Sequence, residues 1–299
     1  MGRRTSKTEK GPRLEAIARA ARRPALSYHV VVLVGIGAAL ATINALALVI
    51  LFQSDQVGVA PDYQQYVDAV ERAFAGEELY GPEWKWRYAP VAAYLMAPAV
   101  WLGLLGWSVL HVLALLLVRP WWLAALMFAS WPFWVDVISG NTVTFVAAAG
   151  LVALRGSTAG AYAYWALCLL IPRPFQLPLA LYLLWRRQDL WRGAALMVVA
   201  LAAITLIVGQ AGDWIVYLLE RGAENTGLPF SIHPASDWGA AWLIVGIPAA
   251  ILLTVFGWPG LGGVVLSPSL LAQYLLISVA HGPSLIRARK KRGRLRLLR

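Results

Sequence analysis

Long uncharged apolar runs separated by short polar segments organise this chain. The first run covers residues 29–52 and carries no charge after His29, and it is long enough to cross the roughly 30 Å hydrocarbon core of a bilayer as a helix. A polar, basic arm precedes it, and the run is too long for the apolar core of a cleavable signal peptide. We therefore expect a retained first helix and a multi-pass, all-α protein of the cell membrane.

Shorter apolar runs continue to residue 284. We predict that 89–107 is re-entrant or lies in the interface, because 108–119 must itself lead back to the side of Arg119. Crossings are predicted near 120–138, 142–154, 159–172, 174–185, 191–209, 240–256 and 270–284, with a short outward piece that ends at LSPS between the last two. Several fall short of the ~20 apolar residues that a spanning helix needs, and short or broken helices are tolerated where they line a water-filled cavity. The expected fold is a bundle of about ten transmembrane or partly spanning helices.

The charges indicate how this bundle is oriented. The net charge is +11, yet 16 of the 26 basic residues lie in 3–23 and 287–299, which favours membrane anchoring at the two ends over nucleic-acid binding. The positive-inside rule then makes the arm 1–28 and the tail 285–299 cytoplasmic, on either side of a transmembrane domain at 29–284. The net acidic loops 53–88 and 210–239 are expected outside.

Several kinds of chemistry have no signature here. The single cysteine, Cys168, excludes an intrachain disulfide and a cysteine-rich metal site. HExxH, Walker, GxSxG and DxD motifs do not occur, so no metal, nucleotide or other cofactor is signalled.

Asp62, directly after Pro61 in the stretch APDYQQYVDAV, has two interpretations. With Gln65 three positions on, it resembles the N-cap and capping box of an amphipathic interfacial helix. Alternatively, it is a general base at the mouth of a cavity.

Arg173 lies between two prolines inside an apolar hairpin, in LLIPRPFQLP. Prolines break a helix and expose backbone polar groups, and a guanidinium fixed at such a break suits a phosphate or carboxylate. The alternative is a loop arginine that snorkels to lipid headgroups.

Other polar residues are predicted near the same outer half of the membrane, where their cost makes them functional candidates. Asp136 and Asn141 are equally well explained as a helix cap, and His233 as a solvated loop residue, while His111 and His281 are interpreted as structural. The weaker substrate-binding candidates are Tyr63, Tyr66, Tyr88, Asp136, Asn141, Gln176, His233, Ser267 and Gln273, and Tyr274 is predicted to lie with them.

The stretch DYQQYVDAVERAFAGEELYGPEWKWRYAP resembles the D-x3-Y-x2-A…G-x2-LY…Y-x-P segment of glycosyltransferase family 87. These DUF2029-type enzymes are polyprenyl-phosphate-mannose-dependent mannosyltransferases of the GT-C superfamily. Later segments follow in the family's order. SGNTVTFVAAAGLVAL is similar to its GQ-x-N segment, LLIPRPFQLPLALYLLWRRQ to its K-x-x-P segment and VVLSPSLLAQYLL to its S-P segment.

This resemblance implies roles for two residues. Asp62 matches the family's catalytic aspartate, and Arg173 stands where a lysine usually faces the donor phosphate. Asn141 replaces the usual glutamine, and His233 is a possible stand-in for a histidine that often follows the S-P segment. The implied fold is a GT-C-type bundle whose first outer loop carries an interfacial helix.

The function expected from the resemblance is sugar transfer at the outer face. A hexose, most plausibly mannose, would pass from a polyprenyl phosphate carrier to a lipid-linked or glycolipid hydroxyl, with no cofactor. Two alternatives remain open, which are a transporter or flippase for an amphiphile, and a non-catalytic relative of the family.

Overall fold

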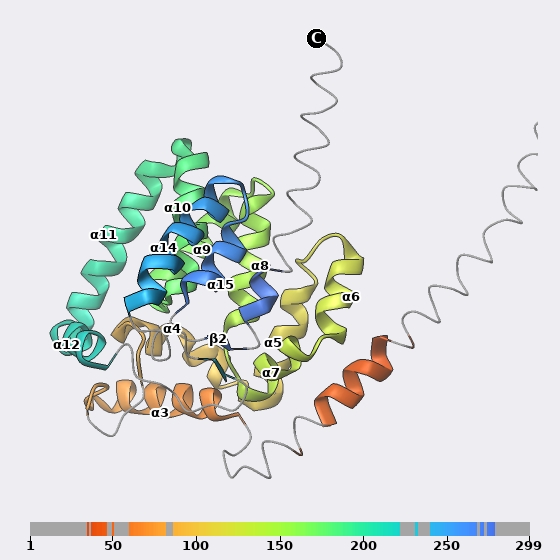
Figure 1. Cartoon of the computed structure of the whole chain (residues 1–299). Coiled ribbons are helices and arrows are strands. Elements are labelled where there is room, and N and C mark those ends of the chain that lie inside the picture. Colours follow the sequence, from red (N-terminus) through yellow and green to blue (C-terminus); the bar gives the residue numbers. More distant parts are fainter. Residues whose placement is uncertain are drawn as a thin grey trace, which may run out of the picture.

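The computed structural model describes residues 35, 37–46, 50, 60–81, 86–221, 231–232, 240–267, 270–271 and 274–278, and this part of the chain is almost entirely helical (Figure 1). The longer helices are α3 (Pro61–Ala75), α4 (Pro90–Val100), α5 (Gly103–Leu115), α6 (Trp121–Ala129), α7 (Trp131–Ser139), α8 (Val143–Leu154), α9 (Thr158–Leu170), α10 (Leu177–Arg186), α11 (Trp191–Val208), α12 (Ala211–Arg221), α14 (Ala240–Val255) and α15 (Pro259–Leu266). Short 3-10 turns lie at η1 (Pro174–Gln176) and η2 (Gln188–Leu190), and the strands β1 (Ser231–Ile232) and β2 (Leu270–Leu271) have two residues each.

Several described helices have the composition of membrane spans. Residues Gln188–Val208, which are η2 and α11, form one helix long and apolar enough to cross a bilayer unaided. Two bent pairs pass the same test as pairs, α4 with α5 at 97° and α6 with α7 at 68°. The prediction of an all-helical protein with membrane-spanning character is confirmed at this level.

The helix breaks predicted from the sequence coincide with those of the structure in one region and differ from them in another. The bend between α4 and α5 falls inside 89–107, where a re-entrant or interfacial segment was predicted. The segment 120–138, predicted as a single crossing, is bent, because the chain turns extended at Ser130 and restarts as α7 with Pro132 in its first turn, and the two helices pass the test for a span only as a pair.

The last predicted helix, 270–284, begins later than expected. Ser231 and Ile232 pair antiparallel with Leu271 and Leu270, so the start of the predicted helix is extended chain. Helical turns appear only from Tyr274 to 278, and residues 279–284 lie outside the described part.

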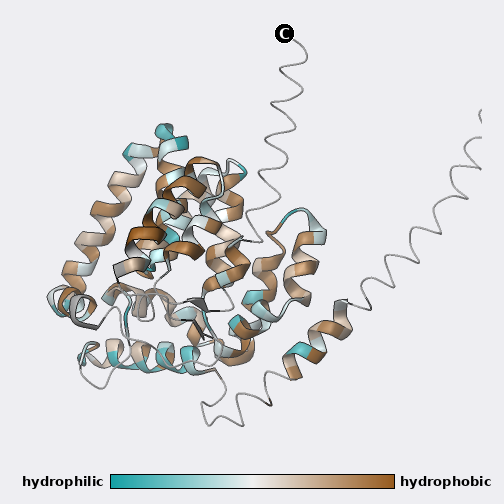
Figure 2. Ribbon diagram, viewed as in Figure 1, coloured by the Kyte–Doolittle hydropathy of each residue, from teal (hydrophilic) through white to brown (hydrophobic). Residues whose placement is uncertain are grey.

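The turns between helices fall at two ends of the bundle. At one end, the Arg187 guanidinium donates to the Gly156 carbonyl at 2.9 Å and to the Thr158 hydroxyl at 3.2 Å, which joins two basic turns. Figure 2 shows hydrophilic residues at the α10–α11 turn and along α3, with mainly apolar helices between them.

At the other end, the two loops predicted to be outside contact each other. The Leu79 N–H donates to the Gln210 side chain at 2.7 Å, and the Gln210 amide donates to the Glu77 carbonyl at 3.1 Å. The Trp214 indole likewise donates to the Arg87 carbonyl at 3.2 Å. The predicted grouping of these loops on one side therefore matches the contacts.

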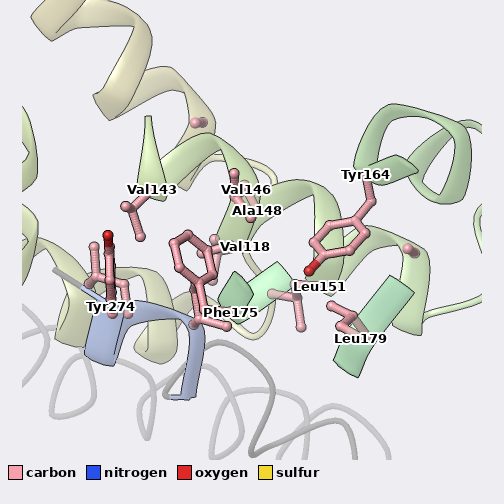
Figure 3. Packing of buried hydrophobic residues seen from close by; sticks show 14 of the residues in the cluster. Val118, Val143, Val146, Ala148, Leu151, Tyr164, Phe175, Leu179 and Tyr274 are labelled. Carbon is pink, nitrogen blue, oxygen red and sulfur yellow. The ribbon is translucent and has the colours of Figure 1, made fainter. Parts of the chain in front are cut away.

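The main apolar core lies among α8, α9, α10 and α15 (Figure 3). Phe175, Val143 and Tyr274 pack there with fully buried residues such as Leu151 and Leu179. A Cβ on Gly263 would lie 2.0 Å from the Phe175 carbonyl oxygen, so only glycine lets α15 approach η1 so closely. This packing holds the segment that carries Arg173.

Candidate functional site

Asp62 does not cap its own helix. The N-cap of α3 is Ala60, which has a left-handed backbone (φ 59) and no side chain that can cap, and Asp62 stands one residue inside the first turn. The capping-box interpretation of the sequence is therefore wrong. The Asp62 carboxylate instead accepts a hydrogen bond from the Asn141 side-chain amide at 2.8 Å.

The surroundings of Asp62 change its acidity. Burial raises the pKa of this carboxyl to about 6, an effect that the nearby Asp136 reinforces. The positive charge of Arg173 and hydrogen bonds from Asn141 and Ser139 pull the pKa in the other direction without cancelling the burial effect. Asp62 as a whole residue is only partly buried, whereas its carboxyl lies deep enough for burial to be the main influence on its pKa.

The turn between α7 and α8 holds the partner of Asp62 in place. Gly140 adopts φ 75, and a Cβ there would lie 2.4 Å from the Cβ of Tyr63, so α3 packs directly on this glycine. The Trp107 indole donates to the Gly140 carbonyl at 2.9 Å, and His111 Nε2 lies 2.7 Å from the Asn141 carbonyl. His111 is fully buried, in keeping with its predicted structural role.

Asp136 lies at the same turn, where it caps the first residues of α8. Its side chain is fully buried, and it accepts from the backbone N–H groups of Val143 at 3.2 Å and Thr144 at 2.7 Å. These groups begin α8, so the carboxylate compensates the positive end of the helix. This geometry agrees with the cap interpretation and leaves no exposed face for a substrate.

Arg173 lies at the break between α9 and η1. Its backbone N–H donates to the Gln176 side-chain oxygen at 3.1 Å, which fixes the first turn of η1. Its guanidinium donates to the Tyr88 hydroxyl and, at 3.5 Å, to the Tyr274 hydroxyl. Within the described residues, no carboxylate lies at ion-pair distance from this guanidinium.

Tyrosines connect the two charged residues. The hydroxyl groups of Tyr66 and Tyr88 lie 3.4 Å apart, and Tyr66 projects from the same helix as Asp62. Burial holds the pKa of Tyr66 well above its usual value, so this phenol stays a neutral hydrogen-bonding group. Asp62, Tyr66, Tyr88, Arg173 and Tyr274 thus form one polar site from four separate segments.

The remaining candidates have different surroundings. The Tyr63 hydroxyl donates to the Val100 carbonyl at 2.8 Å, which gives this tyrosine a packing role between α3 and α4. Gln176 and Ser267 are almost fully buried, and the Gln176 oxygen is committed to Arg173. His233, Gln273 and His281 lie outside the described residues.

Two contributors were missed by sequence reasoning. Ser139 hydrogen-bonds to Asp62, and Trp107 supports the turn beneath it. Ser139 was discoverable because it lies between Asp136 and Asn141 in the stretch DVISGN, residues 136–141, whereas Trp107 has no local signal because its contact depends on how α5 packs against the turn. Among the residues described, no group of three His, Cys, Asp or Glu side chains could hold a metal ion.

Comparison with protein-family models, with characterised proteins and with solved structures finds no match for this chain. Its function is therefore argued from the chemistry of the site.

Proposed function

We propose that this chain is a membrane glycosyltransferase of the GT-C type that moves a sugar, with mannose as the first candidate, from a polyprenyl phosphate to a lipid-linked or glycolipid hydroxyl. In this proposal both termini are cytoplasmic and the site faces outward. The observation that carries it is the proximity of Asp62 and Arg173, which are far apart in the sequence but close enough for the charge of Arg173 to lower the pKa of Asp62. Arg173 acts electrostatically on the Asp62 carboxyl, and tyrosines lie between them.

Asp62 has the properties of a general base. A pKa of about 6 leaves the carboxyl mostly ionised near neutral pH, yet makes it more basic than an ordinary aspartate. General bases work best when their pKa lies near the working pH. Burial of the carboxyl limits competing water, and in this proposal the acceptor hydroxyl approaches from the partly exposed side of the residue.

Arg173 has the properties of an anion-binding residue. A guanidinium is permanently charged, and here its described partners are neutral phenols rather than a carboxylate. Its charge is therefore available for a phosphate, with which guanidinium groups form strong paired hydrogen bonds. When no substrate is bound, the Tyr88 and Tyr274 hydroxyls accept hydrogen bonds from the guanidinium and hold it in one orientation.

These two residues supply the parts of an inverting transfer. Asp62 takes the proton from the acceptor hydroxyl while the acceptor oxygen forms a bond to the anomeric carbon of the donor. The bond between that carbon and the phosphate oxygen breaks, and the lipid phosphate leaves with the electron pair. Arg173 stabilises the charge that develops on this phosphate. Because the leaving group is a lipid phosphate and not a nucleotide diphosphate, the proposal includes no metal or other cofactor.

A transfer assay tests the proposal. Purified protein in lipid nanodiscs is incubated with labelled polyprenyl-phosphate mannose, glucose or arabinose and a membrane lipid extract. We expect label to move from one carrier to an extractable lipid product. Absence of transfer from every carrier would contradict the proposal.

The same site suits one other function. The bends of 97° and 68° in the two broken helix pairs are features that transporters also use to build a polar cavity. A flippase would move the intact carrier lipid between leaflets without breaking the sugar–phosphate bond. Recovery of unchanged carrier in the opposite leaflet of reconstituted vesicles, without product, would favour this alternative.

A further inference from the structure

The side chain of Asn141 is held by contacts at both of its polar atoms. Its oxygen Oδ1 accepts from the backbone N–H of Thr142 at 2.7 Å, so the amide nitrogen must point the other way. That nitrogen donates to Asp62 Oδ2 at 2.8 Å. Asn141 is 2% exposed, so solvent does not compete for these contacts.

The backbone beneath Asn141 is equally constrained. The Asn141 N–H donates to the Asp136 carbonyl at 2.9 Å, and the Asn141 carbonyl faces His111 Nε2 at 2.7 Å. The Trp107 indole holds the preceding carbonyl, that of Gly140. The amide therefore approaches Asp62 from a rigid platform, which is what a precisely placed hydrogen-bond donor requires.

We infer that Asn141 is a positioning residue for Asp62, and that its amide holds the carboxylate in one orientation and in the charged form that accepts a proton. The inference rests on the proposed function for its catalytic consequence. It replaces the expectation that Asn141 binds substrate, because the described contacts occupy both ends of the amide.

The inference predicts the direction in which the pKa of Asp62 shifts when the Asn141 amide is removed. An N–H donated to a carboxylate favours the ionised form, so removing it raises the pKa of Asp62 and moves the acid limb of the rate profile to higher pH. The other groups that act on Asp62 remain in place in such a variant. They are Arg173 from the α9–η1 connection and Asp136 and Ser139 from α7, and the neutral phenols of Tyr66 from α3 and of Tyr274 also interact with the Asp62 charge.

Two variants of Asn141 and one matched control carry the test. Asn141→Leu removes the amide at similar size, and Asn141→Asp keeps the contact with Thr142 but places a second carboxylate oxygen beside Asp62. The control is Thr144→Val on the next helix, whose hydroxyl is buried without a hydrogen-bond partner among the described residues. The acid limb of kcat/KM should rise by about one pH unit in Asn141→Leu and further in Asn141→Asp, and stay in place in the control.

A second readout does not depend on transfer activity. Hydrophobic carbodiimides modify protonated carboxyl groups in membrane proteins, so the pH dependence of labelling at position 62, measured by mass spectrometry, reports the charge of Asp62 directly. The midpoint should lie near pH 6 in the unmodified chain and about one unit higher in Asn141→Leu. Asp62→Asn, which should not be labelled, confirms the assignment.

The outcomes separate this inference from the proposed function. An upward shift in labelling supports the role of Asn141 even if no sugar transfer is detected. An unshifted midpoint in both folded Asn141 variants overturns the inference even if the enzyme is active. A uniform loss of rate with an unmoved acid limb would also overturn it, because that is the effect of a purely structural residue.

Discussion

At the residue scale, the ionised carboxylate of Asp62 destabilises the folded protein at neutral pH. Burial favours its neutral acid, so the pKa in the folded protein, about 6, lies above the ordinary value of 3.8. For such a group, stability is greatest below the unfolded pKa and is lost as pH rises from about 4 through about 6. Retaining a destabilising carboxylate is common at sites that need one for chemistry.

Asp62→Asn should therefore stabilise the protein clearly more at pH 7.5 than at pH 4.5. The expected gain at pH 7.5 is on the order of 2 kcal/mol, because the amide carries no charge to desolvate. Denaturation in detergent at the two pH values measures it. If the variant is less stable than the parent at pH 7.5, Asp62 is a stabilising residue and the account of its environment is wrong.

Arg173→Gln should lower the rate of sugar transfer strongly while the protein still folds. Losing a charge-assisted contact to the leaving phosphate removes about 2 to 4 kcal/mol of transition-state stabilisation, or roughly 30- to 1000-fold in rate. Arg173→Lys should recover part of this loss, since it restores the charge without the forked geometry. Initial rates of transfer check the prediction.

The control for Arg173 is Arg186→Gln. Arg186 lies over the rings of Tyr182 and Trp185 at the end of α10, away from the proposed phosphate site. Its loss should leave the rate near that of the parent. Equal effects of the two substitutions would mean that the loss at Arg173 does not come from a specific contact with the phosphate.

Sequence reasoning reached the charged residues but not their relationships. Asp62 and Arg173 were visible because an acid after a proline and a cation between prolines are unusual in apolar surroundings. The link from Asn141 to Asp62 spans two helices that are distant in the sequence, and no local pattern encodes it. Likewise, the sequence offered Asp62 as a possible cap because Ala60, which has no polar side chain, gives no signal of its own.

At the element scale, the close approach of α3 to the α7–α8 turn positions Asp62. Gly140→Ala should disrupt it, because the new Cβ would lie 2.4 Å from the Tyr63 Cβ and the residue would keep φ 75. We expect a loss of about 2 to 4 kcal/mol in stability and of about 100-fold in transfer, since a shift near 1 Å at a reacting group has an effect of that size. Thermal unfolding and transfer rates measure the two effects.

Gly76→Ala is the matched control at the opposite end of α3. Gly76 has a similar φ, 73, but a Cβ there would meet nothing within 4 Å. This variant should lose only about 1 kcal/mol and keep its activity. Equal losses of activity in both variants would show that backbone strain, and not the contact with Tyr63, governs the site.

The predicted helices were most accurate where a run was long and ended clearly. Residues 191–209 were predicted and α11 spans Trp191–Val208, with Gly209 directly after it. The break at Ser130 was missed although Pro132 marks it, because the apolar run continues through both helices. The pairing of Leu270–Leu271 with Ser231–Ile232 depends on a distant segment and could not be read locally.

At the scale of the whole molecule, the turns between helices fall into the same two groups by their contacts as by the charges in their sequences. Glu77 and Gln210 meet at one end, while Arg187 joins Gly156 at the other. The grouping followed from counting charges in short loops, which is the level at which the positive-inside rule operates. Which end faces the cytoplasm is an expectation from that rule alone.

Single cysteines placed in a Cys168→Ala background test the orientation. Glu78→Cys should react with an impermeant maleimide added to intact cells, and Asp189→Cys should react only after permeabilisation, since both positions are exposed at opposite ends of the bundle. The reverse pattern would place the proposed site on the cytoplasmic side and contradict the proposed topology.

The central claim is that Asp62 accepts the proton of the attacking hydroxyl, and the most direct test compares two aspartates on α3. Asp68 lies on the polar face, where Gln64 donates to it at 2.9 Å. With labelled polyprenyl-phosphate sugar as donor, Asp68→Asn should transfer at about the parent rate, and Asp62→Asn should be slower by about 100-fold or more, because an amide cannot act as the base. An Asp62→Asn protein that transfers sugar as fast as Asp68→Asn would contradict the account.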